Sequence, residues 1–261
     1  MIMKSLLKSK KYKYLVMNSN KTHEEYNMNS TNSTTMKRVP MSSLRKTSLL
    51  AGVIYLLTFV SIPTLAIYSQ VKGANYIIGS GPDTPAIIGG ILEIIVALAG
   101  IGTAVVLFQI LKKQNERLAI GLIASRVLEA SCIFVGVAFI LTIVTLKQSG
   151  AGEDALVISH TLAILYDRIF LISQSLLPAV NDLLLGFLLY QSRLVPRALS
   201  MIGLVGGPIL IIGFIAVMFG LIGQDDPLKG LFAIGVALFE FSLGIYLVVK
   251  GFKPSPITAG I

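Results

Sequence analysis

The sequence has little charge and almost no cysteine. Only 13% of its 261 residues are charged, about half of the roughly 25% that is typical of a soluble globular domain. A soluble chain of this length needs charged side chains to cover its surface, and a disordered chain needs still more of them. Cys132 is the only cysteine, so no internal disulfide can form. These absences exclude an ordinary soluble enzyme, a disordered protein and a secreted disulfide scaffold.

Hydrophobic residues make up 54% of the chain and are concentrated in long runs. Six of these runs are long enough to cross a hydrocarbon core of about 30 Å as helices. None shows the apolar–polar alternation of a barrel strand. We therefore predict an all-α, polytopic bundle of six transmembrane helices. The predicted spans are residues 48–68, 86–111, 118–146, 158–190, 199–222 and 228–250.

The distribution of Lys and Arg predicts the orientation of the bundle. Ten of the 22 basic residues precede residue 48, and seven more lie in alternate connections and the C-terminal tail. By the positive-inside rule, both termini are cytoplasmic. We predict a disordered basic cytoplasmic tail over residues 1–43, a membrane domain over 44–253 and a short tail over 254–261. The chain is then a multi-pass protein of the cell membrane. Its partner is the lipid bilayer rather than nucleic acid, because no compact basic domain is present to hold a duplex.

Charged residues inside the predicted spans need partners, because an isolated charge in the bilayer is expensive. Arg126 and Glu129 are three residues apart, so they share a helix face and are predicted to pair. Asp167 and Arg168 are expected to neutralise each other. The acids left within the spans are Glu93, Glu129, Asp182 and Glu240. Opposed by Arg126 alone, they require bound protons, a bound cation or a water-filled cavity.

The fourth predicted span carries a continuous polar stripe. His160, Asp167, Gln174 and Asn181 recur every seven residues, and Thr161, Arg168, Ser175 and Asp182 follow beside them. Such a stripe cannot face lipid. Pro178 lies on it and predicts a kink that frees the carbonyl of Gln174. The stripe is either a binding site of the kind found at broken transporter helices or a polar packing seam, and the sequence leaves both open.

The candidate binding residues are Glu93, Arg126, Glu129, Gln174, Asn181, Asp182 and Glu240. The sequence has no glycine-rich phosphate loop, zinc-protease helix or CxxC motif, so we assign no catalytic residue, metal or cofactor. We favour a proton- or cation-coupled carrier of an unidentified small solute, using a buried carboxylate cluster. Six spans are few for a monomeric carrier, and a homo-oligomer would answer that objection. The alternatives are a structural or regulatory membrane component and a metal-dependent intramembrane enzyme with His160 among its ligands.

Several segments in order resemble a known family. They are LLAGVIYLL at 49–57, NERLAIG at 115–121, SRVLEA at 125–130, GFLLYQSRLVPR at 186–197, and Glu240 followed by YLVVKG at 246–251. With them the chain resembles the bacterial integral membrane family called domain of unknown function 4386, over residues 43–253. The resemblance implies a six-helix membrane protein and no particular activity. Arg126, Glu129 and Glu240 match positions where the family carries the same residue types, and the N-terminal extension has no counterpart in it.

Overall fold

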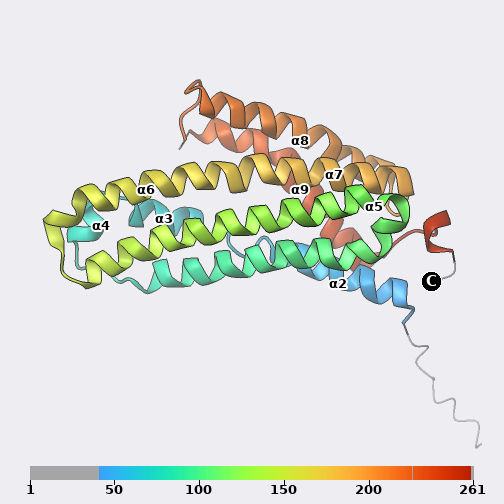
Figure 1. Ribbon diagram of the computed structural model, residues 1–261, viewed down its shortest axis with the longest axis horizontal. Helices are drawn as coiled ribbons and strands as arrows, with labels where there is room; N and C mark the ends of the chain where they lie inside the picture. The colour runs from blue at the N-terminus through green and yellow to red at the C-terminus, as the bar shows by residue number, and fades with distance from the viewer. Residues whose placement is uncertain (1–40, 225, 260–261) are drawn as a thin grey trace, which may run out of the picture. The chain divides into compact units, whose positions relative to one another are not determined.

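The computed structural model describes residues 41–224 and 226–259, and every regular element in this part of the chain is helical. The chain divides into the units Met1–Met41 and Ser42–Ile261. The predicted tail therefore lies almost wholly outside the described residues, and the helices of the described part belong to the second unit. They are α2 (Ser43–Leu57), α3 (Thr64–Val71), α4 (Ala74–Ile78), α5 (Thr84–Gln148), α6 (Leu156–Leu171), α7 (Leu177–Ser192), α8 (Arg197–Met218) and α9 (Pro227–Val249) (Figure 1). The all-α fold is confirmed.

The first predicted span is not one helix. Helix α2 ends at Leu57, the chain runs through turns at residues 58–63, and α3 begins at Thr64. Pro63 has no N–H to continue a helical hydrogen-bond ladder. The Thr58 hydroxyl also donates to the Tyr55 carbonyl at 2.6 Å, a local bond of the kind that competes with helix propagation. The prediction of an unbroken helix over residues 48–68 is therefore wrong.

The second and third predicted spans are the two arms of α5. Asn115 interrupts the helix with an extended backbone (φ −159°, ψ 105°). Its side-chain oxygen accepts from the Leu118 amide at 3.1 Å and so caps the second arm. The two arms then run side by side in opposite directions (Figure 1). Both predicted helices are present, and the loop expected between them is reduced to a turn at one residue.

The fourth predicted span contains a wide turn rather than a simple proline kink. Residues Ile172–Leu176 form a π-helical turn between α6 and α7. The Leu177 amide donates to the Ile172 carbonyl, five residues back. Pro178 follows in the first turn of α7, where its missing N–H is tolerated. A π turn widens the helix locally and is frequent at functional sites.

Four helical runs of the described residues are long and apolar enough to cross a membrane: α5, Gly152–Ser192, α8 and α9. Each arm of α5 alone exceeds the ~20 residues that a crossing needs. Large apolar side chains face outward from these helices, and Leu98, Ile212 and Ile234 are 57%, 59% and 56% exposed. Lipid is the surrounding that suits such outward faces, so the helices are those of a multi-pass membrane protein.

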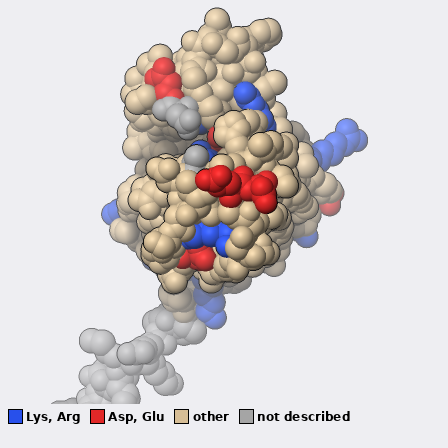
Figure 2. All heavy atoms as spheres, turned by 90° about the vertical axis from the view of Figure 1, so that its left-hand side faces the viewer, with Lys and Arg blue, Asp and Glu red and all other residues tan. Residues whose placement is uncertain are grey.

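The charged connections lie at the two ends of the second unit. At one end, Gln114 beside the α5 turn donates to Gln191 of α7 at 3.2 Å. The basic residues of this end include Arg45, Lys46, Lys112, Lys113, Arg117, Arg193, Arg197, Lys250 and Lys253. At the other end, Lys147 pairs with Asp83 at 2.8 Å. Figure 2 faces this second end, where acidic side chains gather beside basic ones. The asymmetry that we used to predict orientation is thus present in space, while the orientation itself stays a prediction.

Candidate functional site

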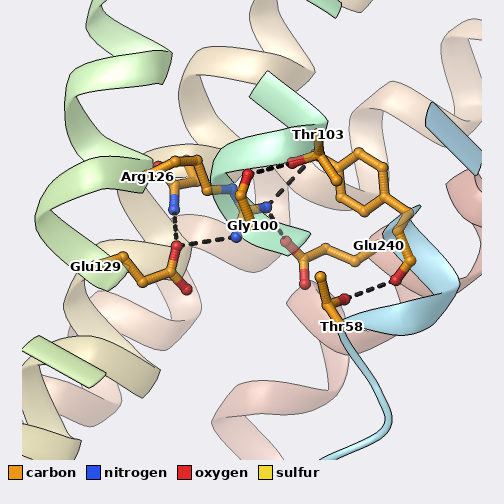
Figure 3. Close-up of polar contacts among 8 residues, drawn as sticks. Thr58, Gly100, Thr103, Arg126, Glu129 and Glu240 are labelled. Atoms are coloured by element: carbon orange, nitrogen blue, oxygen red, sulfur yellow. Dashed lines mark hydrogen bonds and ion pairs between the residues drawn. The ribbon is translucent and has the colours of Figure 1, made fainter. Parts of the chain in front are cut away.

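Arg126 is the centre of a buried ionic network. It lies on the second arm of α5 and is 3% exposed. Its Nη1 donates to Glu129 Oε2 at 3.0 Å, and its Nη2 donates to Glu240 of α9 and, at 3.4 Å, to the Tyr55 hydroxyl of α2 (Figure 3). The Arg126–Glu129 pair is as predicted. The network also ties α5 to α9 and α2, which sequence spacing does not reveal.

The polar stripe of the fourth span reaches the same network. Asn181 is fully buried on α7, and its side-chain amide donates to Glu129 Oε2 at 2.7 Å. Glu129 Oε2 therefore accepts from both Arg126 and Asn181. The next residue, Asp182, is also fully buried, and neither of its carboxyl oxygens has a hydrogen-bond partner within the described residues. An unpartnered buried carboxyl is costly to the fold.

Glu93 forms a second, separate polar centre on the first arm of α5. It is 5% exposed and accepts from the Tyr166 hydroxyl at 3.0 Å. The rings of Tyr166 and Tyr68 meet edge to face, with centroids 5.3 Å apart. Gly89 makes room for Tyr68, since a Cβ there would lie 2.7 Å from Tyr68 Cε1. Glu93 thus contacts a tyrosine, while Glu129 and Glu240 contact Arg126.

A cavity of about 250 Å³ lies between these two polar centres. Its charged and amide lining residues are Glu93, Arg126, Glu129, Gln174 and Glu240. Residues 58, 59, 61 and 62 of the break between α2 and α3 form part of its wall, as do Phe170 and Pro178 on either side of the π turn. Asn181 and Asp182 are not among the lining residues. Five of the seven predicted site residues therefore share one cavity, and the other two lie outside its lining.

One predicted pair is wrong. Asp167 does not pair with Arg168; its Oδ1 accepts from Lys72 Nζ at 2.7 Å, in the segment that follows α3. Adjacent residues on a helix point about 100° apart, so a carboxylate and a guanidinium at i and i+1 do not face each other. Both partners are partly exposed, so this ion pair belongs to the end of the bundle rather than to the cavity.

The chain is similar to one known protein family. A family model described as Domain of unknown function (DUF4386) matches residues 50–251. This range covers most of the 261-residue chain and includes Glu93, Arg126, Glu129 and Glu240. The chain belongs to the DUF4386 family. No curated protein and no solved structure matches this DUF4386 protein. The family assignment therefore does not bring an activity with it.

A metal centre finds no support in the described part of this DUF4386 protein. Across residues 41–224 and 226–259, no group of three or more His, Cys, Asp and Glu residues could hold a metal ion. His160 is exposed on α6. The site also includes residues that the sequence prediction missed, above all Tyr55 and Phe59 near the break. Pro63 within the first hydrophobic run is the signal that would have indicated the break.

Proposed function

We propose that this DUF4386 protein is a proton- or cation-coupled carrier of a small solute, with its solute site in the cavity beside Arg126. One observation carries the proposal: two separate helix irregularities, the break at residues 58–63 and the π turn Ile172–Leu176, border one cavity that holds the ionic network. Non-helical backbone at membrane depth is tolerated only where it is buried or lines a cavity. Many secondary transporters build their midplane sites from such broken helices.

The proposal includes six membrane crossings with both termini cytoplasmic. The crossings would be the broken pair α2 and α3, the two arms of α5, the run Gly152–Ser192, α8 and α9. An even number of crossings puts both termini on one side. The basic end of the bundle would then face the cytoplasm under the positive-inside rule.

The charge of the cavity supports ion coupling. Glu93, Glu129 and Glu240 line it with Arg126 as their only cationic neighbour in the lining. Three carboxylates opposed by one guanidinium favour the entry of a proton or a cation into a low-dielectric space. Arg126 contacts two of these carboxylates. A cation binding at Glu240 would weaken the contact that joins α5 to α9, and binding would in this way alter the packing of those helices.

A structural or regulatory role is the second candidate. The observation that favours it is the set of partners around Arg126: two carboxylates and the Tyr55 hydroxyl, drawn from α5, α9 and α2. A network with so many bonds can serve to fix helix positions alone. The two candidates differ in whether the cavity opens to water on both sides of the membrane.

Cysteine accessibility tests that difference without knowledge of the solute. In a Cys132→Ala background, Ser61→Cys and Ala233→Cys each place one thiol in the cavity lining, and Leu98→Cys places one on the outward face of α5. A membrane-impermeant maleimide is applied to intact cells and to inside-out vesicles. A carrier predicts labelling of both cavity thiols from both sides and of the Leu98→Cys thiol from neither. Labelling of the cavity thiols from one side only, or from neither side, contradicts the carrier.

A further inference from the structure

A surface hollow at the basic end of the bundle has no part in the carrier cavity. It has a volume of about 430 Å³ and is lined by Arg193, Val195, Arg197, Lys253 and Pro254. Arg193 and Val195 belong to the connection from α7 to α8, and Arg197 is the first residue of α8. Lys253 and Pro254 belong to the segment after α9.

Two hydrogen bonds hold the C-terminal segment against this connection. The Lys253 amide donates to the Leu194 carbonyl at 2.8 Å, and the Ser255 hydroxyl donates to the Ser192 carbonyl at 2.5 Å. They bring Lys253 beside the two arginines, although about 60 residues separate them in sequence. Three cationic side chains from two distant segments therefore line one hollow.

The cations of this hollow are available to an anion. Within residues 41–224 and 226–259, no carboxylate forms an ion pair with Arg193, Arg197 or Lys253. The Arg197 guanidinium lies over the Tyr190 ring, 5.0 Å from its centroid, which keeps the charge and leaves the N–H groups free to donate. Arg and Lys together bind phosphate by charge-assisted hydrogen bonds, and an arginine can do so through two parallel bonds.

The backbone adds to the positive potential. Helix α8 starts at Arg197, and its N-cap, Pro196, makes no side-chain capping bond. In the described part of the chain, the amides of Arg197 and Ala198 donate to no acceptor. The N-terminus of a 22-residue helix carries a partial positive charge that favours an anion.

An apolar row continues directly from the hollow along α8. Met201, Val205, Ile209 and Ile212 follow Arg197 at intervals of three or four residues and are 41–59% exposed. They therefore lie near one outward face of the helix. A free phosphate ion would have no use for this row, whereas the acyl chains of a phospholipid would cover it while its phosphate occupied the hollow.

We propose that this hollow binds the phosphate group of one anionic phospholipid, whose acyl chains pack along α8. Basic pockets at the cytoplasmic side of membrane helices bind anionic headgroups in this way. The inference does not depend on the carrier proposal, since the hollow and the cavity share no lining residue.

Lipid quenching tests the proposal on the full chain. The protein has no tryptophan, so Met201→Trp supplies a single fluorophore one helical turn from Arg197. The protein is reconstituted with phosphatidylglycerol or phosphatidylcholine carrying brominated acyl chains, which quench only nearby tryptophan. We expect phosphatidylglycerol to be preferred at this position about tenfold. Each cation near an anionic headgroup contributes at most roughly fivefold, and the phosphate of phosphatidylcholine contacts the same groups. A Leu98→Trp reporter on α5 should show no preference.

A matched pair of triple variants assigns the effect to the hollow. Arg193→Gln, Arg197→Gln and Lys253→Gln together should abolish the preference. Lys112→Gln, Lys113→Gln and Arg117→Gln remove the same charge from the same end and should leave it intact. Equal losses in both would mean diffuse attraction and would overturn the site. Reversal of the preference by millimolar inorganic phosphate would overturn the lipid as occupant.

Arg193 offers a variant that separates binding from folding. It has a positive φ of 57°, the only non-glycine residue with one among the described residues. Glycine adopts this conformation without strain, so Arg193→Gly should fold at least as well as the wild type. A weakened phosphatidylglycerol preference with an unchanged melting temperature supports the site. An unchanged preference in this variant excludes Arg193 from it and contradicts the three-cation hollow.

Discussion

Replacing Arg126 by methionine removes one charge from the buried network and leaves two behind. Methionine nearly matches the length of the arginine stem, so the change is mainly electrostatic. Glu129 and Glu240 then remain in the protein interior, with side chains 9% and 12% exposed, and lose their common counterion. Breaking a buried ion pair by deleting one partner destabilises a protein by about 3–5 kcal/mol. With two carboxylates left unpaired, we expect the upper part of that range.

Stepwise neutralisation of the acids should reverse the loss. Glu129→Gln in the Arg126→Met background removes one uncompensated charge and keeps an oxygen to accept from Asn181. Adding Glu240→Gln removes the other. Because replacing an entire buried ionic group by neutral side chains is often nearly neutral or stabilising, the triple variant should return to within about 2 kcal/mol of the wild type. Rescue by Glu129→Gln alone should be incomplete, since Arg126 has two acidic partners rather than one.

The assay is unfolding in mixed detergent micelles as the mole fraction of sodium dodecyl sulfate rises, followed by far-ultraviolet circular dichroism. Glu153→Gln is the matched control, because Glu153 is exposed in the turn before α6 and its neutralisation should change the free energy of unfolding by under about 0.5 kcal/mol. Additive damage in the triple variant would refute the electrostatic account. So would an Arg126→Met variant as stable as the wild type.

Three further predictions concern single positions. Gly89→Ala places a Cβ 2.7 Å from Tyr68 Cε1 and should lower the free energy of unfolding by about 1–3 kcal/mol, measured by the same titration. Lys147 donates a hydrogen bond to Asp83 and holds the pKa of this carboxyl below its usual range. A lowered native pKa stabilises the fold above the unfolded value and loses this effect as pH falls through the native value, so the melting-temperature deficit of Asp83→Asn at pH 7 should shrink below about pH 4. Asp182→Asn removes a fully buried, unpartnered carboxyl and should leave the melting temperature unchanged or raise it.

Controls for these changes are available in the chain. A Cβ at Gly230 meets nothing within 4 Å, so Gly230→Ala should be tolerated where Gly89→Ala is not. Asp154 is exposed, so the melting temperature of Asp154→Asn should equal that of the wild type at both pH 7 and pH 4. A melting temperature lowered by Asp182→Asn would mean that the carboxyl has a stabilising partner in the folded protein, and the account of that residue would be wrong.

Helix type and burial were predictable, while helix continuity was not. Hydropathy located both arms of α5, because each is a long apolar run. It did not detect the break at residues 58–63, since those residues are as apolar as the helices beside them. Pro63 carried the missing information, but a proline inside a span can produce a kink, a π turn or a break. Pro178 stands beside a π turn and Pro63 at a break, and the surrounding packing selects between these outcomes.

Ion-pair partners were predictable only within a helix. The spacing of Arg126 and Glu129 fixes a shared face, and they pair as expected. Glu240 is 114 residues from Arg126, and Lys72 is 95 residues from Asp167. Such partners depend on which helices pack together, and one sequence does not specify that. Placing Asp167 with Arg168 failed because nearness in sequence was taken for nearness on the helix surface.

The stability of the neutral triple variant also bears on function. If Arg126→Met with Glu129→Gln and Glu240→Gln folds as well as the wild type, the ionic network is not needed to hold α2, α5 and α9 together. A purely structural role for it would then lose its main support. Its position on the wall of the cavity would remain to be explained, and binding a solute or a coupling ion is the role that would account for it. If the Ser61→Cys and Ala233→Cys thiols are labelled from both sides less readily when the three substitutions are added, and the protein remains folded, the network acts in the conformational change rather than in stability.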